Sequence, residues 1–228
     1  MVSIVKKCKK AVADLGRILL VHKHQNSVII TKGAWEKVDA ENYIYHKEAI
    51  TMDFYKRALE LKDETVADRR YIHQNAETGL ELPKTKAYVM DKLKEYGLDP
   101  VECGEGVTAT LGNGGRVLLL RADMDGLPMP EESGEAFACP TGKTAHTCGH
   151  DFHAAMLLSA ARILKEQESK LKGTVKFMFQ PAEETFQGSK NMIEHGILEN
   201  PKVDAALAYH VSPGKMPVGL LCIMIKAQ

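Results

Sequence analysis

The chain has 228 residues, of which 44% are hydrophobic and 26% are charged, and its 30 basic residues balance its 30 acidic residues. A net charge of zero gives no reason to expect nucleic acid or an anionic membrane as partner, and no stretch approaches the roughly 18 uninterrupted apolar residues of a membrane span. The five cysteines are odd in number and irregularly spaced, which argues against a disulfide framework and favours a reducing, cytoplasmic setting.

Residues 1–51 have no clear hydrophobic period, because their apolar residues come in short bursts. Asp14 and Arg17 interrupt the apolar stretch that a signal peptide would need. We therefore expect an extension that is loosely packed or disordered. A further hypothesis is that residues 47–49 are encoded by a bacterial ribosome-binding sequence, so that Met52 is the natural start and the preceding residues are translated leader. A genuine extension is the alternative.

The segment after residue 51 predicts two helices. Residues 52–75 place apolar side chains at a roughly helical spacing, namely Phe54, Ala58, Leu61, Val66 and Ile72. The second helix is expected from about Thr85 to Tyr96, because Gly97 is a typical helix-ending residue. A short strand is expected near residues 108–111.

From residue 116 onward, strands alternate with helices. We predict strands at 117–122, 174–180 and 203–211, a long helix at 151–171 and a shorter helix at 189–195. The first strand is a continuous apolar run, as expected for a strand buried on both faces. The alternation predicts an α/β fold with a largely parallel central sheet.

Polar side chains follow these strands at the end where open α/β sheets bind their ligands. They are Asp123 and Asp125 after the first strand, Glu183 and Glu184 after the second, His210 after the third, and His146, Cys148, His150 and Asp151 in the loop before the long helix. Such side chains bind divalent metals, so the sequence predicts a metal site at this rim.

Cys148 and His150 are two residues apart, which is unlike a structural zinc knuckle and suits a loop that folds two ligands around one metal. The start of the following helix favours negative charge, which predicts a stabilised Cys148 thiolate, and Gly149 would permit an unusual backbone turn. The alternative is a buried free cysteine followed by a helix-capping Asp151. His153, one turn into the helix, is either a core residue or a support behind the ligands.

Glu183 and Glu184 are adjacent carboxylates that can divide labour, one binding a metal and the other acting as a general base. The alternatives are an acidic surface turn for this pair, a satisfied core histidine at position 210, and an ordinary turn at Asp123 and Asp125. Each alternative is reasonable singly, but jointly they require several coincidences at one rim of one sheet.

Five motifs occur in order along the chain: RRYIHQNAETG (69–79), LLRADMDGLPMPE (119–131), HTCGHDFHAAML (146–157), FQPAEE (179–184) and YHV (209–211). Together they resemble the dinuclear metallopeptidase-like amidohydrolases, a group that includes hippurate hydrolase, N-acyl-amino-acid deacylases and plant indoleacetyl-amino-acid hydrolases. The resemblance covers residues 52 to about 220. It implies a three-layer catalytic domain whose central sheet is flanked by helices.

The resemblance also implies a reaction, the metal-dependent hydrolysis of N-acyl amino acids to a carboxylic acid and a free amino acid. Two divalent ions, manganese or zinc, are implied; a thiolate suits zinc, while oxygen and imidazole ligands leave manganese open. The implied roles are metal ligation by Cys148, His150, Glu184 and His210, general-base catalysis by Glu183, and orientation of a ligand by Asp125.

The chain departs from the family pattern at Gln228, where the family continues into a lid domain and a returning segment with one more histidine ligand. The lid normally helps to bind the substrate carboxylate and often forms a homodimer interface. We therefore expect residues 52–228 to be an incomplete catalytic domain with an exposed sheet edge, which binds metal weakly and turns over slowly. The alternatives are an inactive truncated relative with a partial metal site and a non-enzymatic metal-binding protein. The acyl group and the amino acid of the substrate stay undetermined.

Overall fold

The structure is a computed structural model that describes residues 18–20, 23–24, 27–28, 54–212 and 222–224. The chain divides into two compact units, residues 49–211 and residues 1–48 with 212–228. In the smaller unit, β1 (Ile18–Leu20) pairs antiparallel with β9 (Cys222–Met224), and β2 (Lys23–His24) pairs antiparallel with β3 (Ser27–Val28). The other residues of the proposed extension, and Met52, lie outside the described part of the chain.

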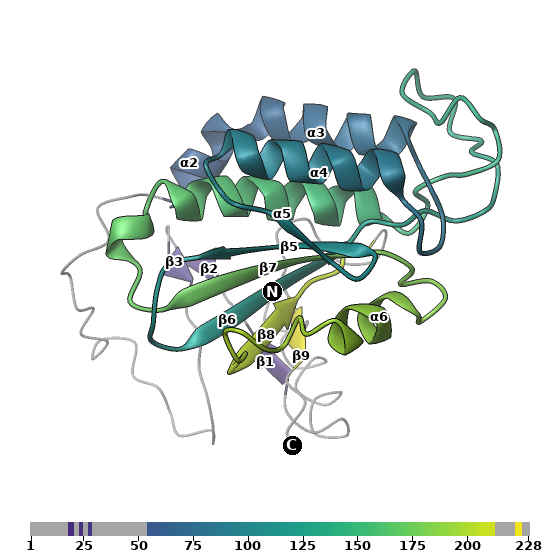
Figure 1. Ribbon diagram of the computed structural model, residues 1–228. Helices are drawn as coiled ribbons and strands as arrows, with labels where there is room; N and C mark the ends of the chain where they lie inside the picture. Colours follow the sequence, from purple (N-terminus) through teal and green to yellow (C-terminus); the bar gives the residue numbers. More distant parts are fainter. Residues whose placement is uncertain (1–17, 21–22, 25–26, 29–53, 213–221, 225–228) are drawn as a thin grey trace. The chain divides into compact units, whose positions relative to one another are not determined.

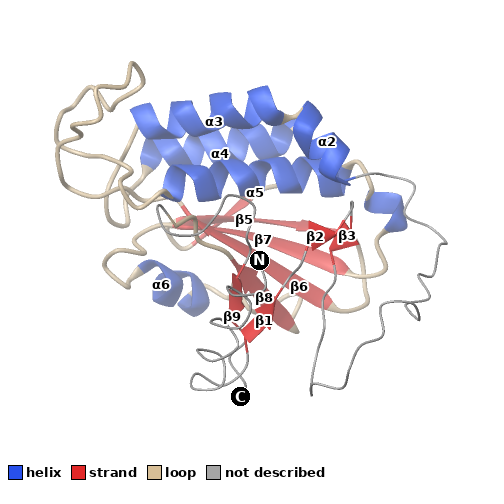
Figure 2. Ribbon diagram, turned by 180° about the vertical axis from the view of Figure 1, so that it is seen from behind, coloured by secondary structure: helices blue, strands red, loops and turns tan. Residues whose placement is uncertain are grey.

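The larger unit has three layers, as predicted, with a sheet between two layers of helices (Figure 1). One face is covered by α2 (Phe54–Glu60), α3 (Lys62–Gln74), α4 (Pro83–Glu95) and α5 (His150–Lys165), which a 3-10 turn (Glu168–Lys170) follows. The other face carries α6 (Gly188–Glu194), as the view from behind also shows (Figure 2). No described helix is both long and apolar enough to cross a membrane.

The five-stranded sheet of this unit has the order β4-β5-β7-β6-β8. Its strands are β4 (Val101–Cys103), β5 (Gly106–Leu111), β6 (Val117–Asp123), β7 (Thr174–Gln180) and β8 (Ala205–Ala208). The three strands predicted after residue 116, now β6, β7 and β8, are parallel to one another. Strand β5 pairs antiparallel with β7, and β4 pairs antiparallel with β5. Because parallel strands end at the same rim, the residues after β6, β7 and β8 come together there.

The core lies on both faces of β7, which is buried at every one of its seven residues. Phe177 and Phe179 point to the layer of α3, α4 and α5, and Met178 packs with Met192 of α6 and with Ile197. The prediction of a strand buried on both faces therefore fits β7 better than β6, where Leu118 is 37% exposed. At the edge of the described sheet, β8 is exposed at all four residues.

The single helical face predicted for residues 52–75 is only half right. Leu61 and Ile72 are buried, but Phe54 and Val66 are 40% and 37% exposed. The helix breaks at Leu61 into α2 and α3, and this break shifts the buried stripe relative to a continuous 3.6-residue period. The long helix also ends earlier than predicted, at Lys165 instead of residue 171, because the chain continues as a 3-10 turn.

Candidate metal centre

His150 lies at the centre of the predicted rim. It is the first residue of α5, it is fully buried, and it follows Gly149, whose φ of +86° lies in the left-handed region. A Cβ on Gly149 would meet Val211 Cγ2 at 2.5 Å, so both the backbone angle and the space require glycine. The unusual turn predicted between Cys148 and His150 is therefore confirmed.

Asp125 joins the start of α5 to the acidic turn after β7. Its Oδ1 accepts hydrogen bonds from the Glu183 backbone N–H at 3.0 Å and from His150 Nδ1 at 3.3 Å, and its Oδ2 accepts from the Glu184 backbone N–H at 3.2 Å. Since Nδ1 carries the proton, Nε2 of His150 keeps a free lone pair. Asp125 is thus more than a turn residue: it orients an imidazole and two carboxylates at once.

The free Nε2 of His150 faces three carboxylates, those of Asp123 at 3.7 Å, Glu183 at 3.8 Å and Glu184 at 3.7 Å. Burial alone would lower the pKa of His150, but the hydrogen bond to Asp125 and the nearby negative charges raise it. Two of these buried atoms, His150 Nε2 and Glu184 Oε1, find no hydrogen-bond partner in the described part of the chain. Buried nitrogen and oxygen atoms that converge without hydrogen-bond partners fit a bound cation, which would displace their protons.

Cys148 and His210 approach His150 from two loops. Cys148 Sγ lies 3.4 Å from His210 Nε2, and His210 Nδ1 donates to the Val211 carbonyl at 2.5 Å, which directs the Nε2 lone pair toward the sulfur. The ligand atoms of Cys148, His150 and His210 lie within 4.8 Å of one another, and so do those of His150, Glu183 and Glu184. The structure therefore brings the other three predicted ligands, and Glu183, close to His150.

The prediction that the start of α5 stabilises the Cys148 thiolate is wrong for the protein groups that surround it. Burial, the contact with Glu184 and the charges of Asp123 and Glu183 raise the pKa of Cys148 to about 11. Burial and these carboxylates together outweigh the favourable start of α5, because the carboxylates are full charges at short range. A divalent cation would reverse this balance, since a coordinated thiol loses its proton.

The turn that carries Glu183 and Glu184 is tightly held. Ala182 has a φ of +48°, and a Cβ on Gly188 would lie 1.5 Å from the Pro181 carbonyl oxygen. A non-glycine residue at positive φ is strained, and such strain is tolerated where the surrounding structure holds the backbone in place. The close approach of Gly188, at the start of α6, to Pro181 thus restrains the backbone from which both carboxylates project.

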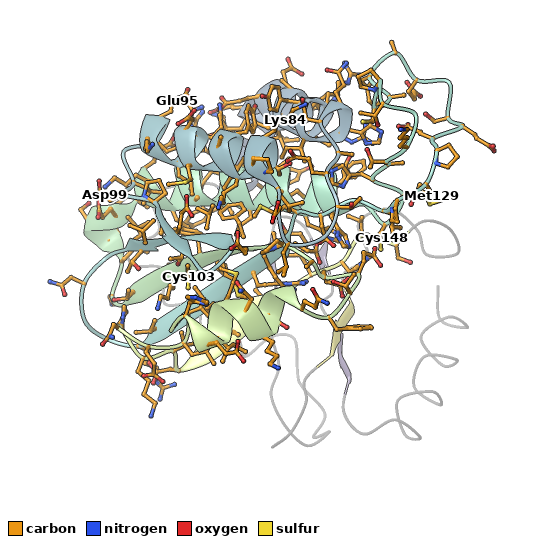
Figure 3. The ribbon with its side chains drawn as sticks, turned by 45° about the vertical axis from the view of Figure 1, so that its right-hand side comes forward. Lys84, Glu95, Asp99, Cys103, Met129 and Cys148 are labelled. Atoms are coloured by element: carbon orange, nitrogen blue, oxygen red, sulfur yellow. The ribbon has the colours of Figure 1, made fainter. Side chains whose placement is uncertain are left out.

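A cavity of about 590 Å³ lies beside the cluster, between α3 and the loop after β6. It is lined by Arg69, His73, Met129, Pro130, Glu131, Glu132, Ser133, Glu135, Phe137, Ala145, His146 and Thr147. Met129 and Cys148 lie at the same end of the sheet, away from Asp99 (Figure 3). The volume of this cavity falls within the range of small-molecule binding sites.

Sequence reasoning missed the polar cluster at this cavity, although the RRYIHQNAETG motif contained part of it. His73 Nδ1 contacts Asp151 at 2.7 Å and its Nε2 contacts Glu131 at 3.0 Å, while Arg69 donates to Asp151 at 2.6 Å. The alternative of a helix-capping Asp151 is therefore wrong, because its carboxylate is directed to α3 and makes no capping bond. His146 is buried and burial lowers its pKa to about 4, so its ring is neutral near pH 7.

The His73 cluster predicts a pH-dependent stability. The hydrogen bond to Asp151 raises the pKa of His73 against its burial, and the bond to Glu131 adds to this. The charges that face the ring are Asp151, Glu131 and the Arg69 guanidinium. Because the pKa of His73 is higher in the folded than in the unfolded chain, its protonated ring stabilises the fold fully below the unfolded value near 6.5. This contribution to the free energy of unfolding is lost as the pH rises through the folded pKa.

We expect His73→Gln to lower the free energy of unfolding by about 1.5–3 kcal/mol at pH 6, the usual value of hydrogen bonds to charged groups. The difference from wild type should shrink at pH 9, as measured by urea unfolding at both pH values. His195→Gln, a change at an exposed position, is the matched control and should leave the pH dependence unchanged. An equal loss at both pH values would show that His73 does not act through its charge.

Comparison with known protein families identifies a match to the model described as peptidase family M20/M25/M40, over residues 119–226. Among curated proteins, the chain is 39% identical over 157 residues to the N-acetyl-L-cysteine deacetylase of Bacillus subtilis, covering 67% of this chain and 37% of that protein. It is 43% identical over 148 residues to the IAA-amino acid hydrolase ILR1-like 6 of Arabidopsis thaliana, covering 63% of this chain and 31% of that protein.

Among solved structures, the chain resembles the YXEP protein of Bacillus subtilis, described as a dinuclear metal binding peptidase from the M20 family. The TM-score is 0.65 at 33% identity, and the match covers 68% of this chain and 44% of that chain. The chain thus spans less than half the length of the relatives that it matches here.

Proposed function

We propose that the chain, whose residues 119–226 match the model of peptidase family M20/M25/M40, acts as the metal-binding part of an amidohydrolase. Its substrates are small N-acyl amino acids, and residues 52–228 belong to the catalytic domain. Support comes from the relatives, which are named as deacetylases and amino acid hydrolases. The observation that carries the proposal is the buried His150, whose free Nε2 lies among carboxylates, a thiol and a second imidazole.

Four residues hold two divalent ions in this proposal: Cys148, His150, Glu184 and His210. When bound, the ions polarise the amide carbonyl and lower the pKa of water. The fit rests on a mixed set of sulfur, nitrogen and oxygen donors and on the unpaired buried atoms of His150 and Glu184. The thiol among the donors favours zinc over manganese.

Glu183 is the general base in the proposed reaction. Its backbone N–H is fixed by Asp125 and its side chain is one-third exposed, so the carboxylate is both placed and accessible to water. Glu183 accepts the proton of the attacking water and delivers it to the leaving amine, which yields a carboxylic acid and an amino acid. Asp125 acts by position, because its two oxygens hold His150 and the backbone of both glutamates.

A cytoplasmic location is part of the proposal. The three cysteines of the described core, Cys103, Cys139 and Cys148, are free thiols. Free thiols, one of them at a proposed metal site, are kept intact in a reducing compartment.

The test is the release of amino acid from hippurate and from a panel of N-acetyl amino acids. Metal-free protein would be assayed with added Zn²⁺ or Mn²⁺, with a chelator-treated sample as the control. Metal-dependent release is the expected result. Bound metal without any release would favour an inactive relative with a partial metal site, and the absence of metal binding would overturn the proposal altogether.

A further inference from the structure

His153 occupies a position that joins three parts of the metal centre. It lies in the first turn of α5, it is fully buried, and its ring stands between the end of β6 and the loop that follows β8. Its Nδ1 lies 2.6 Å from Asp123 Oδ1, and its Nε2 lies 2.9 Å from the backbone nitrogen of Val211. The sequence left open whether this histidine is a core residue or a support for the ligands.

The backbone of Val211 decides the tautomer of His153. A backbone N–H can only donate, so Nε2 of His153 must be the acceptor and must carry no proton. The proton therefore lies on Nδ1 and is donated to Asp123. Both ring nitrogens are used, which leaves no lone pair for a metal, although the ligand atoms of Asp123, His150 and His153 lie within 4.8 Å of one another.

The same histidine holds both neighbours of His210. Val211 donates its N–H to the His153 ring, and the Tyr209 hydroxyl donates to the His153 main-chain carbonyl at 2.9 Å. The His210 ring packs 4.5 Å from the His153 ring, centroid to centroid. His210 itself is exposed and follows a strand at the sheet edge, so these anchors define its position.

Asp123 holds the His153 ring through its Nδ1. It is fully buried and accepts a second hydrogen bond, from Arg121 Nη1 at 2.7 Å. Arg121 also donates to Gln180 at the end of β7. A continuous chain of hydrogen bonds thus runs from Arg121 through Asp123 and His153 to Val211, and from there to the loop of His210.

We propose that His153 is a positioning residue, which anchors Tyr209 and Val211 so that His210 Nε2 faces Cys148. That the positioned imidazole serves a metal ion rests on the proposed function; the anchoring itself does not. Metal ligands are commonly oriented by hydrogen-bonded partners of this kind, and their loss costs about 10- to 100-fold in metal affinity.

Two conservative variants separate the two ends of the ring. His153→Gln places an amide oxygen near the former Nε2, where it can accept from Val211, whereas His153→Asn places an amide near the former Nδ1, where it reaches only Asp123. The first readout is hydrogen exchange of the Val211 amide by NMR. Protection should be kept in the Gln variant and lost in the Asn variant.

The second readout is the affinity of the metal-free chain for Zn²⁺, measured by calorimetric titration. The Asn variant should bind about 10- to 100-fold more weakly than wild type, and the Gln variant should stay close to wild type. Tyr209→Phe, which removes only the other anchor, should also weaken binding.

The two readouts distinguish the possible failures. An unprotected Val211 amide in wild type, or equal protection in both variants, would overturn the anchoring. A change in protection with unchanged Zn²⁺ affinity would overturn the link to the metal site. Lack of Zn²⁺ binding by the wild type would instead count against the proposed function. The hydrogen-exchange data would in that case still test whether His153 anchors Val211.

Discussion

Glu183→Gln is expected to lower metal-dependent release of amino acid by about 10²- to 10⁴-fold, the usual contribution of general acid–base catalysis. Metal affinity should change little, because Glu183 is proposed to move a proton instead of binding an ion. The amide of glutamine keeps the size of the side chain, and the backbone N–H of residue 183 still bonds to Asp125. The measurement is the initial rate on hippurate beside calorimetric titration with Zn²⁺.

Glu184→Gln is the matched control for this prediction, since the two glutamates are adjacent and Asp125 holds both backbones. Glu184 Oε1 is buried, has no hydrogen-bond partner in the described residues and lies 3.7 Å from His150 Nε2, as suits a metal ligand. The Glu184 variant should therefore lose metal affinity as well as turnover. If both variants lost metal equally and kept the same turnover per bound ion, the proposed division between base and ligand would be wrong.

His150→Asn is expected to weaken Zn²⁺ binding by more than about 100-fold, beyond the effect of losing a supporting residue. The asparagine amide can still donate to Asp125 from near the former Nδ1, but it has no group in place of Nε2. The variant thus removes the proposed ligand atom while it keeps the bond that joins α5 to the acidic turn. Calorimetric titration gives the affinity, and urea unfolding monitors whether the fold is retained.

His195→Asn, at an exposed position outside the cluster, is the control for this second variant and should bind Zn²⁺ like wild type. An affinity of the His150 variant within a few-fold of wild type would remove His150 from the ligand set. The cluster would then lose its centre, because His150 belongs to each of the three candidate metal-binding groups in the described residues.

Local sequence patterns predicted the parallel part of the sheet well. Strand β7 matches the expected range of 174–180, because its apolar run is bounded by Gly173 and Pro181, residues that end regular structure. Strand β4 was not predicted, since its three residues are too few for a periodic pattern to be recognised. The break between α2 and α3 was missed because α2 buries no side chain, so its composition carries little information about a face.

The sequence by itself determined which residues gather at the rim. Chain order places Asp123, Glu183, Glu184 and His210 after successive strands, and parallel strands end at one edge, so their convergence follows from topology. The same reasoning identified Cys148 and His150 before α5.

Only the tertiary structure decided how these residues act on one another. The pKa of Cys148 depends on burial and on carboxylates brought close by folding, which a local argument from the helix start cannot include. Two of the three donors to Asp125 are backbone N–H groups 58 and 59 positions away in sequence, and the tautomer of His153 depends on a backbone N–H 58 positions away. Hydrogen bonds are short-range and directional, so a pattern of residue types can predict the members of such a network but not its connections.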